Sequence, residues 1–242
     1  MKNRKTLPGI SFVTGFFWGI VVLAVALVLL IFLLSAGAFL AYSNYLQIIT
    51  AFTGGAALLL LWQQSRDRKF LLWTAAGFLL WGLSNIGWYV NALMGFRSQS
   101  FPAIFDAGLI LSLFLMGYAL WNGLPGKKIP IPALSALLVA CLIVPAWIVI
   151  VSGISMAALA TLGYFLACGV LIAGGLDLSP GRQPLVMIGS FLLALAFVIY
   201  PLREMYMVSA PLLSVIGPVV CAGFALIVIG LFSGSPGPAK PA

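Results

Sequence analysis

Charged residues and histidine are the most conspicuous shortages in this sequence. Only 7% of its 242 residues are charged, against roughly 25% in an ordinary soluble domain, and histidine is absent. The lack of histidine excludes haem held by two histidines, histidine-based metal centres and acid–base catalysis by imidazole. The lack of charge, with 63% hydrophobic residues and a mean hydropathy of +1.20, makes lipid the solvent for most of the chain.

Cysteine is scarce as well. Cys141, Cys168 and Cys221 each lie alone in an apolar run, and no two of them form a CxxC pair. An odd number of isolated cysteines supports neither a disulfide framework nor a zinc site. We therefore expect three small hydrophobic residues inside helices, and no metal or cofactor.

The long apolar runs predict an all-α fold, a polytopic integral membrane helical bundle of about eight transmembrane helices. They lack the residue-by-residue alternation of a membrane β-barrel. A basic amino-terminal segment (1–10) precedes one transmembrane domain (11–232), and a Gly/Pro-rich tail (233–242) that we expect to be disordered follows it. The predicted spans are about 11–42, 45–62, 70–94, 101–121, 133–151, 155–175, 184–201 and 211–232.

The first run is longer than a signal peptide requires. A signal peptide has an apolar core of about 7–15 residues, whereas this run extends from near Ser11 to about Tyr42. We therefore expect an uncleaved first helix that tilts or protrudes, followed by a tight turn at Ser43-Asn44. Gly15 and Gly19 form a GxxxG pattern that permits close helix contact.

The basic residues predict the orientation. Eight spans place both termini on one side, and a cytoplasmic amino terminus puts ten basic residues inside and two outside, which agrees with the positive-inside rule. This grouping between apolar runs is typical of topology signals and does not indicate nucleic-acid binding. The inside residues are Lys2, Arg4, Lys5, Arg66, Arg68, Lys69, Lys127, Lys128, Arg182 and Lys240, and the outside residues are Arg97 and Arg203.

Asp106 is the acidic residue that this topology places inside a span, about one turn below the extracytoplasmic surface. A carboxylate at that depth is costly unless it is paired, so we expect a partner, with Arg203 and Arg97 favoured by level and charge. The polar ends of helices three, four and seven converge there. The candidate binding residues are Asp106, Arg203, Arg97, Trp88, Tyr89, Asn85, Tyr200 and Glu204.

Two interpretations of this polar level stay open. Tryptophan and tyrosine at helix ends form an ordinary interfacial belt, and Asp106 with Arg203 is then a structural clasp. In the other interpretation the same residues line a pocket for a small ligand, a lipid headgroup or a partner helix.

The fourth span resembles a known motif. Pro102, Asp106, Gly117, Tyr118, Gly123 and Leu124 match a Pro-Ser-x-x-Asp, Gly-Tyr and Gly-Leu pattern, and Trp73, Trp81, Gly87 and Trp88 match the span before it. The pattern is similar to the multi-span amino-terminal membrane region of prokaryotic sensor histidine kinases and diguanylate cyclases. Ala103 replaces the usual serine, and no kinase or cyclase domain follows in this sequence. The resemblance implies a sensory or scaffolding module in the plasma membrane of a prokaryote.

Residues 69–124 also align weakly with residues 183–232. Phe78 then matches Phe191, and Pro102 matches Pro211, in what would be a repeated two-helix unit. Val215 stands near the Asp106 position, so a polar site would exist in one copy only.

These observations favour a non-enzymatic multi-pass membrane protein, sensory or accessory in role. Its expected partners are the lipid bilayer and a signalling protein in the cytoplasm or membrane, while a homo-oligomer is left open. A small-solute or ion transporter or channel is the alternative, although the middles of the spans carry few ionisable residues. An enzyme would need convergent catalytic groups, and the sequence shows one in-membrane carboxylate and no embedded lysine.

Overall fold

The structure, a computed structural model, describes residues 10–33, 37–94, 101–124, 128–176, 183–206 and 215–233. Over these ranges the chain forms eight helices and no strand, and every helix is long and apolar enough to cross a membrane. The chain is therefore a multi-pass membrane protein, and the prediction of an all-helical fold with about eight spans is confirmed. The helices are α1 (Ile10–Leu33), α2 (Gly37–Gln64), α3 (Lys69–Leu93), α4 (Ile104–Gly123), α5 (Ile131–Ser152), α6 (Met156–Gly175), α7 (Pro184–Tyr206) and α9 (Ile216–Ser233).

The turn predicted at Ser43-Asn44 is wrong. Helix α1 ends at Leu33 and α2 already begins at Gly37, so both residues lie inside α2. Ser43 is buried against α9, where a Cβ on Gly217 would touch its hydroxyl. The polarity that suggested a turn belongs to a helix–helix contact, in which small polar residues are common within membranes.

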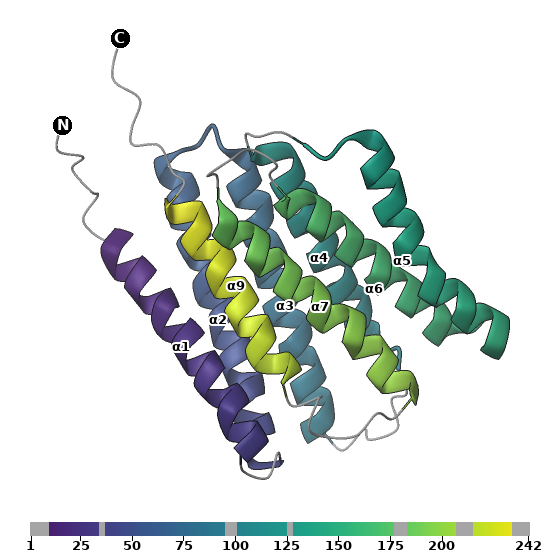
Figure 1. Cartoon of the computed structure of the whole chain (residues 1–242). Coiled ribbons are helices and arrows are strands. Elements are labelled where there is room, and N and C mark those ends of the chain that lie inside the picture. The colour runs from purple at the N-terminus through teal and green to yellow at the C-terminus, as the bar shows by residue number, and fades with distance from the viewer. Residues whose placement is uncertain are drawn as a thin grey trace.

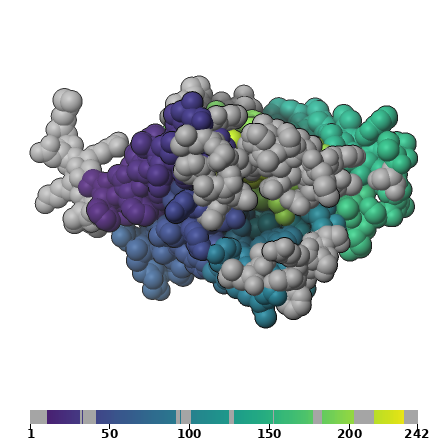
Figure 2. Space-filling model, turned by 90° about the horizontal axis from the view of Figure 1, so that it is seen from below, coloured from purple at the N-terminus to yellow at the C-terminus, as the bar shows by residue number. Residues whose placement is uncertain are grey.

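Six of the helices form a closed ring. Neighbours along the ring are α2, α3, α4, α6, α7 and α9, with α9 packed back against α2. Helix α1 lies outside the ring against α9, and α5 lies outside it against α6, so these two helices occupy opposite edges of the molecule (Figures 1 and 2). The most enclosed helix is α9, with 78% of its span buried, and the least enclosed is α5, with 11%.

Aromatic side chains fill the ring. Trp81 and Phe78 from α3 contact Phe224 from α9, with ring centroids 4.9 Å and 4.5 Å apart, and Trp81 also contacts Phe197 from α7. Trp81, Phe78 and Phe224 are at most 1% exposed. The ring is therefore a packed core and not an open channel at this level.

Glycine allows the closest helix crossings. A Cβ added to Gly117 of α4 would lie 2.6 Å from the backbone nitrogen of Leu171 in α6. Gly189 and Gly223 make the same kind of approach between α7 and α9, where a Cβ on either would meet the carbonyl oxygen of the other. Packing of this kind drives helix association in lipid, where no hydrophobic effect separates helix from solvent.

The helices alternate in direction, so the start of α1 and the end of α9 lie at the same end of the bundle (Figure 1). The basic side chains that the structure describes, Arg66, Arg68, Lys69 and Lys128, also lie at that end, in or beside the connections after α2 and α4. The clustering agrees with the charge pattern of the sequence. The cytoplasmic placement of the termini and the two-helix repeat stay predictions.

Candidate functional site

Asp106 stands in the first turn of α4, at the end of the bundle opposite to the basic residues. Helix α4 begins after Ala103, whose extended backbone (φ −93°, ψ 166°) marks the helix N-cap. A carboxylate in the first turn interacts favourably with the helix dipole. The side chain is nonetheless only 1% exposed, so it needs hydrogen-bond donors from the protein itself.

Three donors from the chain meet that need. Tyr164 of α6 donates its hydroxyl to Asp106 Oδ1 at 2.7 Å, and Tyr200 of α7 donates to the same oxygen at 3.2 Å. The backbone N–H of Ala103 donates to Oδ2 at 2.7 Å. A carboxylate offers about four acceptor positions, so three of them are occupied here. We call Asp106, Tyr164 and Tyr200 the carboxylate clasp, because they connect α4, α6 and α7.

The two tyrosine rings of the clasp pack with two phenylalanine rings. Phe101 and Phe197 join Tyr164 and Tyr200, and every pairing except Phe101 with Phe197 has ring centroids 5.5–6.4 Å apart. We call these four rings the aromatic box. Edge-to-face and stacked pairs at such distances are favourable, each contributing about 0.5–1.5 kcal/mol beyond the area that they bury. The box keeps the carboxylate in a low-dielectric environment, where its hydrogen bonds are strong and their loss is costly.

The structure brings together only part of the predicted site. Tyr200 does reach Asp106, whereas Trp88 contacts the ring of Phe105, with centroids 6.2 Å apart, and not the carboxylate hydrogen-bond set. Asn85 instead donates to the carbonyl of Trp81 in its own helix. Tyr89 pairs with Tyr45 of α2 through both the ring and the hydroxyl, so it belongs to a separate α2–α3 contact.

The other charged side chains of the predicted site are not among those that the structure describes. Arg97 lies outside the described residues, as do the side chains of Arg203 and Glu204, although both of the latter belong to helix α7. Pairing of Asp106 with an arginine therefore stays a prediction. The donors that the structure shows at the carboxylate are two tyrosines and a backbone amide.

Sequence reasoning missed Tyr164. The search concentrated on polar residues near span ends, whereas Tyr164 lies more than two turns into α6 and is fully buried. A usable signal was present, because a tyrosine deep in an apolar span needs a partner for its hydroxyl. Asp106 was the obvious acceptor.

The site is suited to holding helices together more than to chemistry on a substrate. Its carboxylate oxygens already accept hydrogen bonds from α6, from α7 and from the backbone at the start of α4. Among the described residues, no group of three or more His, Cys, Asp or Glu side chains is placed to hold a metal ion. In searches of protein-family models, curated proteins and solved structures, nothing matches this chain.

Proposed function

We propose that this chain is a non-enzymatic sensory or accessory module of the membrane, in which the carboxylate clasp sets how α4 packs against α6 and α7. The observation that supports the proposal is a buried carboxylate that accepts hydrogen bonds from two other helices. A device of this kind has two discrete states, bonded and released, as a switch requires.

The two tyrosine bonds are unequal, and this suggests where the clasp opens. The Tyr164 bond is short and its side chain is fully buried, whereas the Tyr200 bond is longer and its side chain is half-buried. Tyr200 lies near the end of α7, just before Pro201, which removes one helical hydrogen bond from that turn. An event at this end of the bundle would therefore move α7 first and leave α4 and α6 joined.

The resemblance to the membrane regions of sensor kinases and cyclases supports the same proposal. Pro102 and Asp106, which carry that resemblance, mark the entry of α4 and the centre of the clasp. We propose that a separate protein, bound at the end where the basic residues cluster, reads the packing of α3 and α4.

The test measures whether the clasp controls the far end of α4. Nitroxide labels at Asn122 of α4 and Gln64 of α2, both exposed, report the separation of these helix ends in a background with the three cysteines replaced. Asp106→Asn should shift or broaden the distance distribution, because the amide side chain loses the charge-assisted bonds. The control Tyr42→Phe alters an exposed tyrosine of α2 and should leave the distribution unchanged.

The same proteins in liposomes distinguish the transport alternative. Ion or proton flux that the parent supports and Asp106→Asn abolishes would overturn the sensory proposal in favour of transport. An unchanged distance distribution in Asp106→Asn would reduce the clasp to a local structural element.

A further inference from the structure

A cavity of about 540 Å³ opens at the end of the bundle opposite to the carboxylate clasp. It lies where α3 begins and α4 ends, and Gln183 and Leu231 complete it from the start of α7 and the end of α9. This volume is within the range of small-molecule sites in proteins. The lining residues are Asp67, Arg68, Lys69, Phe70, Trp73, Tyr118, Ala119, Asn122, Gly123, Leu124, Gln183 and Leu231.

The outer rim of the cavity carries the charges. Arg68 and Lys69 are consecutive, at the end of the α2–α3 turn and the start of α3, and Asp67 precedes them. The described lining therefore has two cations and one carboxylate, an excess of one positive charge. Basic pockets between membrane helices on the cytoplasmic side of a membrane bind anionic lipid headgroups, and the charge pattern predicts that side for this end of the bundle.

Below the rim, the cavity is lined by two aromatic side chains that are exposed on the outside of the bundle. Trp73 lies four residues after Lys69 at the start of α3, and Tyr118 lies five residues before the end of α4 at Gly123, which places them about 6 Å and about 8 Å below the rim. Both side chains are more than half exposed, Trp73 at 51% and Tyr118 at 64%. In a membrane-spanning bundle such exposure is toward lipid, so the cavity continues from a charged rim to the acyl-chain layer.

The cavity also presents polar atoms for a headgroup. The side-chain oxygen Oε1 of Gln183 is buried and has no hydrogen-bond partner among the described residues. Gln183 also has a positive φ of 49°, which is uncommon for a residue other than glycine. Asn122, which also lines the cavity, donates its Nδ2 to the carbonyl of Tyr118 and leaves its side-chain oxygen as an acceptor.

From the basic rim, the polar acceptors and the exposed aromatic side chains, we propose that the cavity binds an anionic glycerophospholipid. Its phosphate lies between Arg68 and Lys69, a headgroup hydroxyl donates to Gln183, and the first acyl carbons lie along Trp73 and Tyr118. A free phosphate compound would use the cationic rim but would leave the exposed aromatic side chains without a role. The inference does not depend on the proposed signalling role of the clasp.

Binding can be measured on the purified full-length protein by native mass spectrometry and by lipid-dependent thermal stabilisation in detergent. The probes are phosphatidylglycerol, phosphatidylcholine, inorganic phosphate and glycerol 1-phosphate. Phosphatidylglycerol should bind at least tenfold more tightly than phosphatidylcholine, and neither soluble phosphate should bind at the same concentration.

Charge variants locate the headgroup. Arg68→Gln and Lys69→Gln should each weaken phosphatidylglycerol binding about fivefold, the usual effect of one basic residue near an anionic membrane lipid. The matched control is Arg66→Gln. Arg66 lies two residues before Arg68 and is not among the residues that line the cavity, so this variant removes the same charge outside the proposed site. Asp67→Asn should strengthen binding by a similar factor, and a gain of affinity cannot arise from misfolding.

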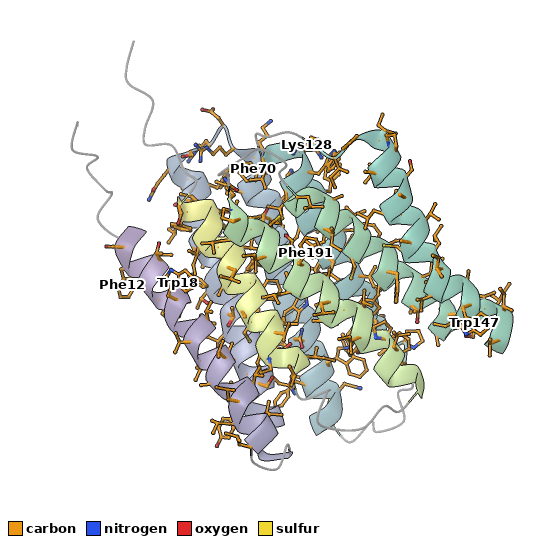
Figure 3. The ribbon with its side chains drawn as sticks, viewed as in Figure 1. Phe12, Trp18, Phe70, Lys128, Trp147 and Phe191 are labelled. Carbon is orange, nitrogen blue, oxygen red and sulfur yellow. The ribbon has the colours of Figure 1, made fainter. Side chains whose placement is uncertain are left out.

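Aromatic variants locate the acyl chain. Trp73→Leu should weaken phosphatidylglycerol binding, whereas Trp147→Leu, which alters another exposed tryptophan on α5 toward the other end of the molecule, should not (Figure 3). Equal binding of the two lipids would overturn the proposal. So would tight binding of a soluble phosphate, or a loss of affinity in Arg66→Gln as large as in Arg68→Gln.

Discussion

Removing one hydroxyl from the carboxylate clasp gives the sharpest test of the structure. Tyr164→Phe keeps the ring inside the aromatic box and deletes the 2.7 Å bond to Asp106 Oδ1. Asp106 then retains Tyr200 and the Ala103 amide as donors. The substitution should therefore destabilise the protein without creating a cavity.

The expected loss follows from the bond and its surroundings. A hydrogen bond to a charged group contributes about 1.5–3 kcal/mol in soluble proteins, whereas side-chain bonds between membrane helices average about 0.6 kcal/mol with a maximum of about 1.7. Because this bond is short, buried and charge-assisted, we expect about 1–2 kcal/mol for Tyr164→Phe. Tyr200→Phe should cost about half as much, since its bond is 3.2 Å long and the side chain is half-buried.

The assay is reversible unfolding in mixed detergent micelles, followed by tryptophan fluorescence, with Tyr42→Phe as the control for an exposed tyrosine. The same substitution is then made in Asp106→Leu, which keeps a similar side-chain shape but offers no acceptor. There the hydroxyl of Tyr164 is a buried donor without a partner, so Tyr164→Phe should be neutral or stabilising. This change of sign distinguishes a hydrogen bond from a packing effect.

Two results would refute the reasoning. One is a Tyr164→Phe protein as stable as Tyr42→Phe. The other is the same destabilisation in the parent and in Asp106→Leu, which would show that the hydroxyl does not act through the carboxylate.

Three further predictions concern packing and the start of α4. Gly117→Leu should destabilise the bundle by at least about 2 kcal/mol in the same assay, because a Cβ at this position has no room against α6. Gly15→Leu should change stability little, because a Cβ there would meet nothing within 4 Å. Equal effects of the two substitutions would contradict the close crossing of α4 and α6. Phe224→Ala should cost about 3–5 kcal/mol by leaving a cavity inside the ring, whereas the exposed Phe12→Ala should cost little. A similar loss in both would mean that the ring is not packed as described. Ala103→Ser should stabilise the protein by about 0.5–1 kcal/mol, because a hydroxyl at the N-cap can accept a hydrogen bond from a first-turn N–H group and complete a capping box with Asp106. A less stable Ala103→Ser protein would show that the N-cap has no space for the hydroxyl.

The predictable part of this fold follows from properties that act along the whole chain. Long apolar runs and clustered basic residues require membrane-spanning helices whatever their packing, so the number of helices could be obtained without knowing any contact. A hydrogen-bonding partner for Asp106 was predictable as well, since a carboxylate within a membrane is costly unless it is paired.

The remainder depends on which helix faces meet, and the sequence carries little information on that. The helices are apolar on all sides, so periodicity does not show that Ser43 faces Gly217 or that Tyr164 faces Asp106. Gly15 and Gly19 are a second example of this limit on prediction from sequence. Their spacing is typical of a helix contact, yet a Cβ added to either would meet nothing within 4 Å in the described structure, whereas Gly117 and Gly189 make close crossings.

The central position of α9 has a consequence for how the protein is made. Of the described helices it leaves the ribosome last, yet it closes the ring between α2 and α7 and supplies the main contact of α1, the helix made first. Until α9 enters the membrane, α1 lacks its main partner and the faces of Phe78 and Gly189 stay uncovered. Nascent chains should therefore remain open, and recognisable to membrane chaperones and proteases, until α9 is inserted.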